Sequence, residues 1–316
     1  MRHVRMLGLC LVAVFAVAAI AATSASALPE WGKCEAKAGG KYSDANCTKK
    51  ASKKSPGEFE WKKATEFTEN ERGFRGNEVI PHKGLLTTTF IKCSGGKQEP
   101  GSCASHGEEE VTFPIEVECQ REFHTGKVKG TKEVANVLVA FASCVVFGSI
   151  PCSNTPIEGE IDTNPLKGSL GYINKPNKEV GVLLTPETKH GSFAQFSCGG
   201  IITTVVGQGS KTQGTAYKET SGEENKGGND GIISPITPVN KMTGDFTQTY
   251  TINAEDENIP SKFEGKPREL LEDYEYPPFE NANKSKWSKA GETIVSESHQ
   301  QGPNGSTEES EAAIKA

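Results

Sequence analysis

Beyond residue 27 the sequence has no apolar run long enough to cross a membrane, and it has no excess of basic residues. The longest remaining apolar run, Val134–Ile150, is shorter than the roughly 20 residues that a membrane-spanning helix needs, so we expect a buried strand there. Residues 1–27 hold two of the 35 bases and none of the 41 acids, which leaves 33 bases, 41 acids and a formal charge of −8. Nucleic-acid-binding proteins usually carry a basic face, so this balance argues against a nucleic-acid partner.

Sequence motifs of enzymes and metal sites are also missing. No serine occupies a G-x-S-x-G turn, and there is no H-E-x-x-H, C-x-x-C, EF-hand or P-loop motif. Each histidine beyond residue 27 stands alone in polar surroundings, and we expect exposed loop positions for all five: His82, His106, His124, His190 and His299. The sequence therefore predicts no catalytic residue, no cofactor and no metal site.

Two exceptions to that prediction stay open. A Ser–His–acid set could still assemble from distant segments, because such sets are recognised by geometry and not by order. The acidic runs Glu108–Glu110 and Glu255–Asn258 could offer oxygen ligands to Ca²⁺, although such runs are more often solvated loops.

The first 27 residues have the three parts of a secretory signal peptide. Arg2 and Arg5 supply the positive charge, Met6–Ala22 is apolar, and Ala25–Ala27 forms an A-x-A cleavage site ahead of Leu28. We therefore expect a secreted mature chain, extracellular or associated with the cell wall, with no transmembrane segment after cleavage.

Cleavage would leave eight cysteines, and an even number in an oxidising compartment predicts a disulfide framework. Only about 30% of the mature residues are apolar, a lean composition in which cross-links should matter. Eight cysteines allow 105 pairings. Proximity along the chain favours Cys34–Cys47, Cys93–Cys103 and Cys144–Cys152, which leaves Cys119 to pair with Cys198.

Helical periodicity is nearly absent, and the patterned segments are short, rich in Val, Ile, Thr and Phe, and bounded by Gly, Pro, Asn or Asp. Many such strands at roughly ten-residue spacing predict an all-β fold, a disulfide-stapled sandwich or barrel. One segment, Pro267–Tyr274, could instead be a short helix. We divide the mature chain into a lysine-rich, cysteine-bridged subdomain (28–70), an all-β domain (71–299) with a mobile loop (207–231), and a polar acidic tail (300–316).

Several stretches of the mature chain resemble an uncharacterised family of secreted actinobacterial proteins. The matching stretches are Leu28–Cys34, Gly40–Lys50, Val134–Val137 leading to Cys144 and Cys152, Gly159–Leu166, Gly168–Ile173, Phe196–Gly200, Val239–Met242 and Ile314–Ala316. The segment 207–231 looks like an insertion relative to that family, and the Cys93/Cys103 pair looks additional. The resemblance implies secretion, a bacterial source and a shared fold, and it supplies no catalytic residue.

Two groups of residues could bind ligands. Tyr274, Tyr276, Phe279 and Trp287 lie close together in sequence and could stack on sugar rings, although aromatic residues of this kind often fill a small β core. The segment Lys33–Lys63 holds nine lysines against four acids. It could contact anionic wall polymers or lipid headgroups, or it could simply be a solvated face.

The leading hypothesis is a secreted, non-catalytic binding or structural protein whose partner is a cell-wall polymer or glycan. A secreted polysaccharide hydrolase with scattered carboxylates is the first alternative, and a deep cleft with two facing carboxylates, one of raised pKa, would favour it. An inhibitor-like effector that binds a protein is the second, and it would present an exposed hydrophobic patch or a rigid loop such as Cys93–Cys103. The oligomeric state is not predicted.

Overall fold

The computed structural model describes residues 28–79, 85–86, 90–94, 110–114, 116–188, 191–200, 202–207, 231–253, 258–268, 271–276, 288–289, 291–301 and 311–316. These residues form strands, the turns between them and two short 3-10 turns (Ala64–Glu66 and Glu69–Glu71), with no α-helix among them. The predicted all-β, disulfide-containing fold is confirmed.

Eight antiparallel strands close into a barrel, because each is hydrogen-bonded to the next and the last is hydrogen-bonded to the first. The strands follow one another around the barrel in chain order, which makes it an up-and-down barrel. Their bounds are Gly73–Val79 (β3), Arg121–Val128 (β8), Glu133–Ala142 (β9), Leu166–Asn174 (β13), Glu179–Pro186 (β14), Ile232–Thr237 (β17), Asp245–Ile252 (β18) and Ile294–Gln300 (β25).

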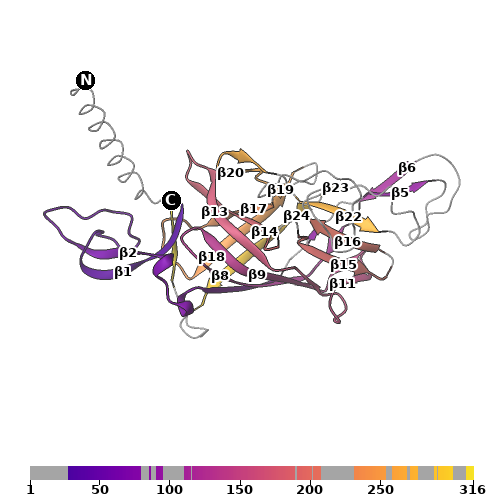
Figure 1. Cartoon of the computed structure of the whole chain (residues 1–316), viewed down its shortest axis with the longest axis horizontal. Helices are drawn as coiled ribbons and strands as arrows, with labels where there is room; N and C mark the ends of the chain where they lie inside the picture. The colour runs from indigo at the N-terminus through magenta and orange to yellow at the C-terminus, as the bar shows by residue number, and fades with distance from the viewer. Residues whose placement is uncertain are drawn as a thin grey trace, which may run out of the picture.

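The connections alternate between the two ends of the barrel, because neighbouring strands are antiparallel. Those at one end are short and join β8 to β9, β13 to β14 and β17 to β18. The four connections at the other end are long, and they build a second sheet of seven strands that forms a half-barrel (Figure 1). Its order is β23-β22-β16-β15-β11-β10-β7, with bounds Ser288–Lys289, Glu272–Tyr276, Ile202–Gly207, Ala194–Cys198, Ile150–Ser153, Val145–Val146 and Val117–Glu118.

The remaining short strands pair either with the ten-stranded sheet or with one another. Ile161–Asp162 (β12) pairs with β9, and Asn258–Ile259 (β19) pairs with β18. The other pairs are Lys262–Phe263 (β20) with Lys266–Pro267 (β21), Gly291–Glu292 (β24) with Leu85–Leu86 (β4), and Phe90–Ser94 (β5) with Glu110–Pro114 (β6). Strands β21 and β22 both fall partly within Pro267–Tyr274, where a short helix was the alternative.

The first and last strands of the described chain lie together at the short-connection end. Glu30–Gly40 (β1) pairs on one side with Gly57–Lys63 (β2) and on the other with Ala313–Lys315 (β26). Figure 1 shows this small sheet at the opposite end of the molecule from β15 and β16. The acidic tail therefore ends in a strand that belongs to the lysine-rich subdomain.

Side chains fill the barrel because successive residues of each strand point alternately inward and outward. In β8 the even-numbered residues are buried and the odd-numbered residues are exposed. Trp31 of β1 covers the short-connection end, where its ring meets Phe246 edge-on at 5.1 Å between centroids. A smaller cluster of Leu183, Ile233 and Phe263 lies where β20 covers the outer wall.

The disulfides correct part of the expected pairing. Cys34–Cys47 is confirmed, but the other bridges are Cys119–Cys144 and Cys152–Cys198, so the expected pairs Cys144–Cys152 and Cys119–Cys198 are wrong. The reason is the strand order of the half-barrel, which places Cys198 of β15 beside Cys152 of β11 and brings Cys119, after β7, beside Cys144, before β10. Proximity along the chain could not indicate that order.

Several expectations lie outside the described residues. These are the signal peptide 1–27, almost all of the loop 207–231, Phe279, Trp287 and Cys103, so the Cys93–Cys103 bridge stays a prediction although Cys93 belongs to β5. Within the part of the chain that the structure describes, no helix has the length and apolar character needed to cross a membrane.

Candidate functional site

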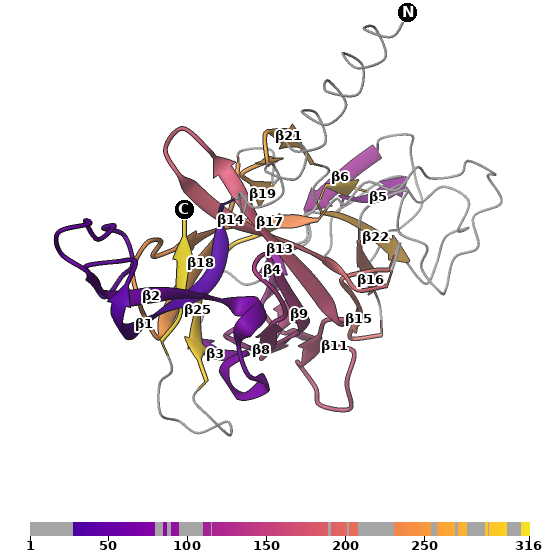
Figure 2. The ribbon, with the colours of Figure 1, turned by 60° about the vertical axis from the view of Figure 1, so that its left-hand side comes forward.

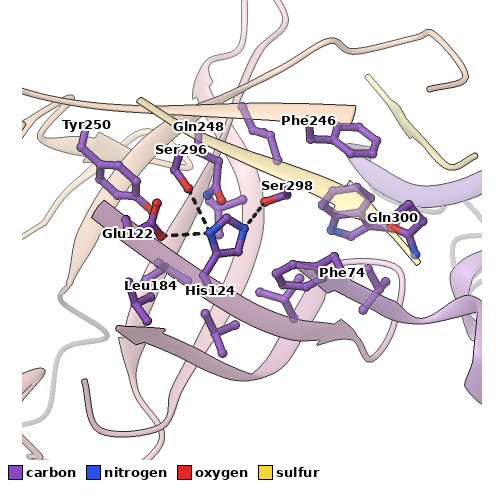
Figure 3. A pocket seen from close by; sticks show the side chains of 17 residues that line it. Phe74, Glu122, His124, Leu184, Phe246, Gln248, Tyr250, Ser296, Ser298 and Gln300 are labelled. Atoms are coloured by element: carbon purple, nitrogen blue, oxygen red, sulfur yellow. Dashed lines mark hydrogen bonds and ion pairs between the residues drawn. The ribbon is translucent and has the colours of Figure 1, made fainter. Parts of the chain in front are cut away.

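The barrel interior has an apolar side and a polar side. Strands β9 and β14 supply Val137, Val139, Val182 and Leu184 to one side of a narrow cavity. Strands β8, β18 and β25 supply the polar side, whose members are Glu122, His124, Gln248, Tyr250, Ser296, Ser298 and Gln300 (Figure 3). A polar cluster inside a barrel needs internal hydrogen-bond partners, because water reaches it poorly.

His124 is the centre of that cluster. Its Nδ1 lies 2.9 Å from Oε1 of Glu122, and its Nε2 lies 2.8 Å from Oγ of Ser298 (Figure 3). The hydroxyl of Ser296 also lies 3.2 Å from Nδ1. All four side chains are buried, so the expectation that His124 is an exposed loop histidine is wrong.

A glycine lets the imidazole reach its serine. Strand β3 lies between β8 and β25 in the barrel, so His124 must extend across β3 to touch Ser298. At Gly76 of β3 a Cβ atom would lie 2.1 Å from Cε1 of His124 and 2.2 Å from the carbonyl oxygen of Glu297. Any other residue at position 76 would force the imidazole or the backbone to move.

The interior is acidic, because two carboxyl groups face it and no Lys or Arg lines either of the two cavities described. Burial and, to a smaller extent, the charge of Glu122 together raise the pKa of Glu292 to about 8. Burial also raises the pKa of Tyr250. Oε2 of Glu122 is buried without a hydrogen-bond partner among the described residues, and a water molecule would satisfy it.

The order Glu122–His124–Ser298 matches the acid, base and hydroxyl of a nucleophilic site, but the interior has no room for a substrate. The cavity leaves about 50 Å³ for the centres of water-sized molecules, which is space for a few waters. Sites for organic ligands are usually several hundred Å³ in volume. Trp31 covers one end, and a second cavity sharing Glu122 and Tyr250 is bounded by Phe193 of the half-barrel side.

The paired carboxyls therefore do not form the cleft that a polysaccharide hydrolase needs. Glu122 and Glu292 are two acids of which one has a raised pKa, as such an enzyme would require, yet both face narrow cavities with room for only a few water molecules. We interpret the cluster as a polar network of the barrel core.

The outer surface offers a second candidate site at the tip of the β1–β2 sheet. The loop Lys41–Pro56, here called the lysine loop, carries the exposed residues Lys49, Lys50, Lys53 and Lys54. None of these four makes an ion pair with the described residues. Four of the other five lysines of the segment Lys33–Lys63 are paired: Lys33 and Lys62 with Glu35 and Glu71, Lys63 with Glu30, and Lys41, at the start of the loop, with Glu60. The fifth, Lys37 of β1, is exposed and makes no ion pair with the described residues.

Glu71 neutralises two of the paired lysines, Lys33 and Lys62. Burial alone would raise its pKa, but hydrogen bonds from Lys33 and Thr68 lower the pKa to about 2. Acids thus neutralise four of the nine lysines, whereas Lys49, Lys50, Lys53 and Lys54 of the lysine loop and Lys37 of β1 are unpaired among the described residues.

Local bonds fix the shape of the lysine loop. Cys47 is bonded to Cys34 of β1, and the only acid of the loop, Asp44, accepts hydrogen bonds from the backbone N–H groups of Thr48 and Lys49. The hydroxyl of Ser52 accepts one from the N–H of Ser55, across the turn that carries Lys53 and Lys54. The ammonium groups are therefore carried on an ordered backbone.

The predicted aromatic group is only partly placed. Tyr274 and Tyr276 lie in β22, opposite Val205 and Thr203 of β16. This strand belongs to the half-barrel, at the end of the molecule away from the lysine loop (Figure 1).

The sequence missed the His124 cluster because its pattern is misleading. In Arg121–Val128 the apolar Phe123 points outward, while Glu122 and His124 point inward. An alternating pattern would normally place Phe on the buried face and the charged residues outside. Ser298 is distant in sequence, so only the closed barrel brings it to His124.

Metal binding gains no support from the geometry, since the described residues contain no group of three His, Cys, Asp or Glu side chains that could hold an ion. Comparison of the chain with protein families, with curated proteins and with solved structures finds no match.

Proposed function

We propose that this chain is a secreted, non-catalytic protein that binds an anionic polymer of the cell surface through its lysine loop. The observation that carries the proposal is the unpaired state of Lys49, Lys50, Lys53 and Lys54 beside lysines that are neutralised. Surface lysines that serve solubility alone need no ordered backbone beneath them. The filled barrel supports a ligand on the outer surface and not inside.

The expected binding is electrostatic. Each lysine near an anionic surface contributes about 1 kcal/mol, and exposed charges are screened beyond roughly 10 Å at 0.1 M salt. We therefore expect retention of the oxidised mature protein on isolated cell walls and on dextran sulfate, little retention on neutral dextran, and release as salt is raised.

Reversing two lysines of the loop tests the site. We expect K53E/K54E to bind dextran sulfate at least about thirtyfold more weakly, because two contacts of about 1 kcal/mol are lost and two repelling charges are added. The matched control is K167E/K175E, which makes the same change in net charge at exposed lysines of β13 and the turn after it. The proposal fails if both double variants weaken binding equally, or if binding does not respond to salt.

Secretion has its own test. Intact-mass and N-terminal analysis of protein from the culture medium should give a chain that begins at Leu28 and lacks free thiols. Free thiols in such material would contradict the extracellular assignment, since the three described bridges would then be absent.

A further inference from the structure

Three aromatic side chains lie beside the lysine loop, on one face of the β1–β2 sheet: Tyr42, Phe59 and Trp61. Phe59 and Trp61 are two residues apart in β2, so both side chains project from the same face. Tyr42, near the start of the lysine loop, pairs with Phe59, and directly paired residues of neighbouring strands share a face. We call these three residues the aromatic strip.

The aromatic strip lies on the face of the sheet that points away from the barrel. Trp61 lies opposite Cys34 of β1, whereas Trp31, which covers the barrel, is three residues from Cys34 and projects from the other face. The β1–β2 sheet extends beyond the barrel in both views (Figures 1 and 2). All three aromatic side chains are half-buried, and none of them belongs to a described hydrophobic cluster. Packing of the core therefore does not explain them.

Phe59 is the member of the strip whose ring is open to a ligand. Its neighbour on one side is Ala36 of β1, an exposed residue with only a methyl side chain, and its neighbour on the other side is Tyr42. Among the described residues the ring of Phe59 makes no contact with another aromatic ring or with a cation. The strip therefore presents a flat apolar surface at this position.

Positive charges border the aromatic strip. Lys50 of the lysine loop pairs with Tyr42, on the side of Tyr42 away from Phe59. Lys315 of β26 places its Nζ 4.0 Å from the ring centroid of Tyr42 and 4.9 Å from that of Trp61, and it donates a hydrogen bond to the hydroxyl of Tyr42. Neither lysine makes an ion pair with a carboxylate of the described residues. Aromatic rings and unneutralised cations thus occur together on one surface.

We infer that the polymer bound by the lysine loop is an acidic polysaccharide, whose sugar rings stack on the aromatic strip while its acid groups contact the lysines. The inference rests on the proposed function of the lysine loop and names the class of its ligand. The apolar face of a sugar ring packs on an aromatic ring, and acid groups on the same polymer complement the unpaired ammonium groups. A neutral glycan would leave the lysines without a partner, and a polyanion without sugar rings would leave Phe59 without one.

Two other occupants fit this surface less well. An interfacial protein buries an apolar face in the membrane boundary, yet the exposed tip of the lysine loop, Ser52–Pro56, holds only serine, lysine and proline. None of the large exposed hydrophobic residues among the described residues belongs to the lysine loop, β1 or β2. Single-stranded nucleic acid also combines stacking with charge, but the acidic net charge of the chain disfavours it.

Two carboxylate polymers with different backbones test the inference. Polygalacturonate has sugar rings and poly-L-glutamate has a peptide backbone, and the lysine loop should bind both. We expect the oxidised mature protein to bind polygalacturonate about tenfold more tightly in a titration, because only the sugar polymer stacks on the aromatic strip. K53E/K54E should weaken the binding of both polymers.

F59L separates stacking from charge. It should lower the affinity for polygalacturonate about tenfold and leave the affinity for poly-L-glutamate within about twofold, because leucine is apolar and of similar size but lacks the flat ring. F59Y keeps the ring and should keep the preference for the sugar polymer. The matched control is F123L, which removes a 37% exposed ring from β8 in the barrel wall and should change neither affinity.

The outcomes distinguish the inference from the proposed function. Equal affinities of the wild type for the two carboxylate polymers, or equal losses of both in F59L, would overturn the inference and leave the lysine loop as a site for polyanions of any backbone. Tighter binding to vesicles of phosphatidylglycerol and phosphatidylcholine, or to oligothymidylate, than to polygalacturonate would overturn it in favour of a membrane or a nucleic acid. Binding to neither carboxylate polymer would contradict the proposed function itself.

Discussion

Glu292 places a carboxyl group at the barrel interior with no Lys or Arg lining the cavities around it. The residue is partly exposed, but its carboxyl group is surrounded by protein. Burial and the charge of Glu122 raise its pKa to about 8, so the folded state retains a proton that the unfolded chain releases near pH 4.5. A raised carboxyl pKa stabilises the fold in acid and lowers its stability as pH rises.

We therefore expect the protein to lose stability between about pH 4.5 and pH 8 and to level off above that range. The loss should be about 2–4 kcal/mol, after allowance for the partial exposure. E292Q keeps the shape of the neutral acid and should abolish most of this slope, as measured by urea unfolding at pH 5 and pH 8. E179Q, at an exposed position of β14, serves as the control, and a variant E292Q that retains the wild-type slope would contradict the assignment.

Glu122 and His124 show why residue type alone did not reveal the interior cluster. The sequence presents them as two polar residues in a polar stretch, and their neighbour Phe123 is the apolar residue that a strand pattern would bury. In the barrel, His124 points inward and Phe123 points outward. Gly76, on the neighbouring strand β3, leaves the space into which the imidazole fits.

At the scale of elements, the half-barrel is the part of the structure that depends most on disulfides. Its strands β7, β10 and β11 are two to four residues long, and so few backbone hydrogen bonds hold a strand weakly. Cys119–Cys144 and Cys152–Cys198 connect these strands to one another and to β15. The barrel strands, in contrast, form a closed ring without such bridges across it.

Removal of one bridge should therefore open the half-barrel before the barrel. We expect C119S/C144S to lose about 2–4 kcal/mol of stability and to show faster amide exchange in β7, β10 and β11 than the wild type. Exchange in β13 and β14 should stay unchanged, because these strands pair with each other over eight positions in the barrel wall. Uniformly faster exchange throughout the chain would show that the bridge supports the barrel as well.

At the scale of the whole molecule, the barrel separates the lysine loop from the half-barrel. The lysine loop lies at the end with short connections, and strand β11 belongs to the half-barrel at the other end (Figure 2). Strand β26 packs at the end with short connections, where it pairs with β1. Its residue Ile314 is completely buried, and Lys315 lies over the rings of Tyr42 and Trp61.

Loss of the Ile314 side chain should loosen the end of the barrel that Trp31 covers. Ile314 lies opposite Trp31 in the β1–β26 pair, and a large-to-small change in a core costs about 2–5 kcal/mol. We expect I314A to lower the urea midpoint and to shift the fluorescence of the protein to longer wavelength as Trp31 becomes hydrated. V295A, at an exposed position, should change neither; an unaltered midpoint in I314A would show that β26 is dispensable for the fold.

The sequence by itself determined the class of fold and one covalent bond. Alternating short segments of Val, Ile, Thr and Phe between turn residues predict strands, because these residue types suit a pleated surface, and Cys34 and Cys47 pair within one small sheet. The concentration of lysine in Lys33–Lys63 was equally visible.

Only the tertiary structure decided which lysines are neutralised, which cysteines meet and which polar residues face inward. Each of these depends on strand order: Glu71 reaches Lys33, Cys198 reaches Cys152 and Ser298 reaches His124 only after distant strands pair. A closed barrel fixes its last partners when its first and last strands join, and that closure involves contacts far apart in sequence that no local pattern encodes.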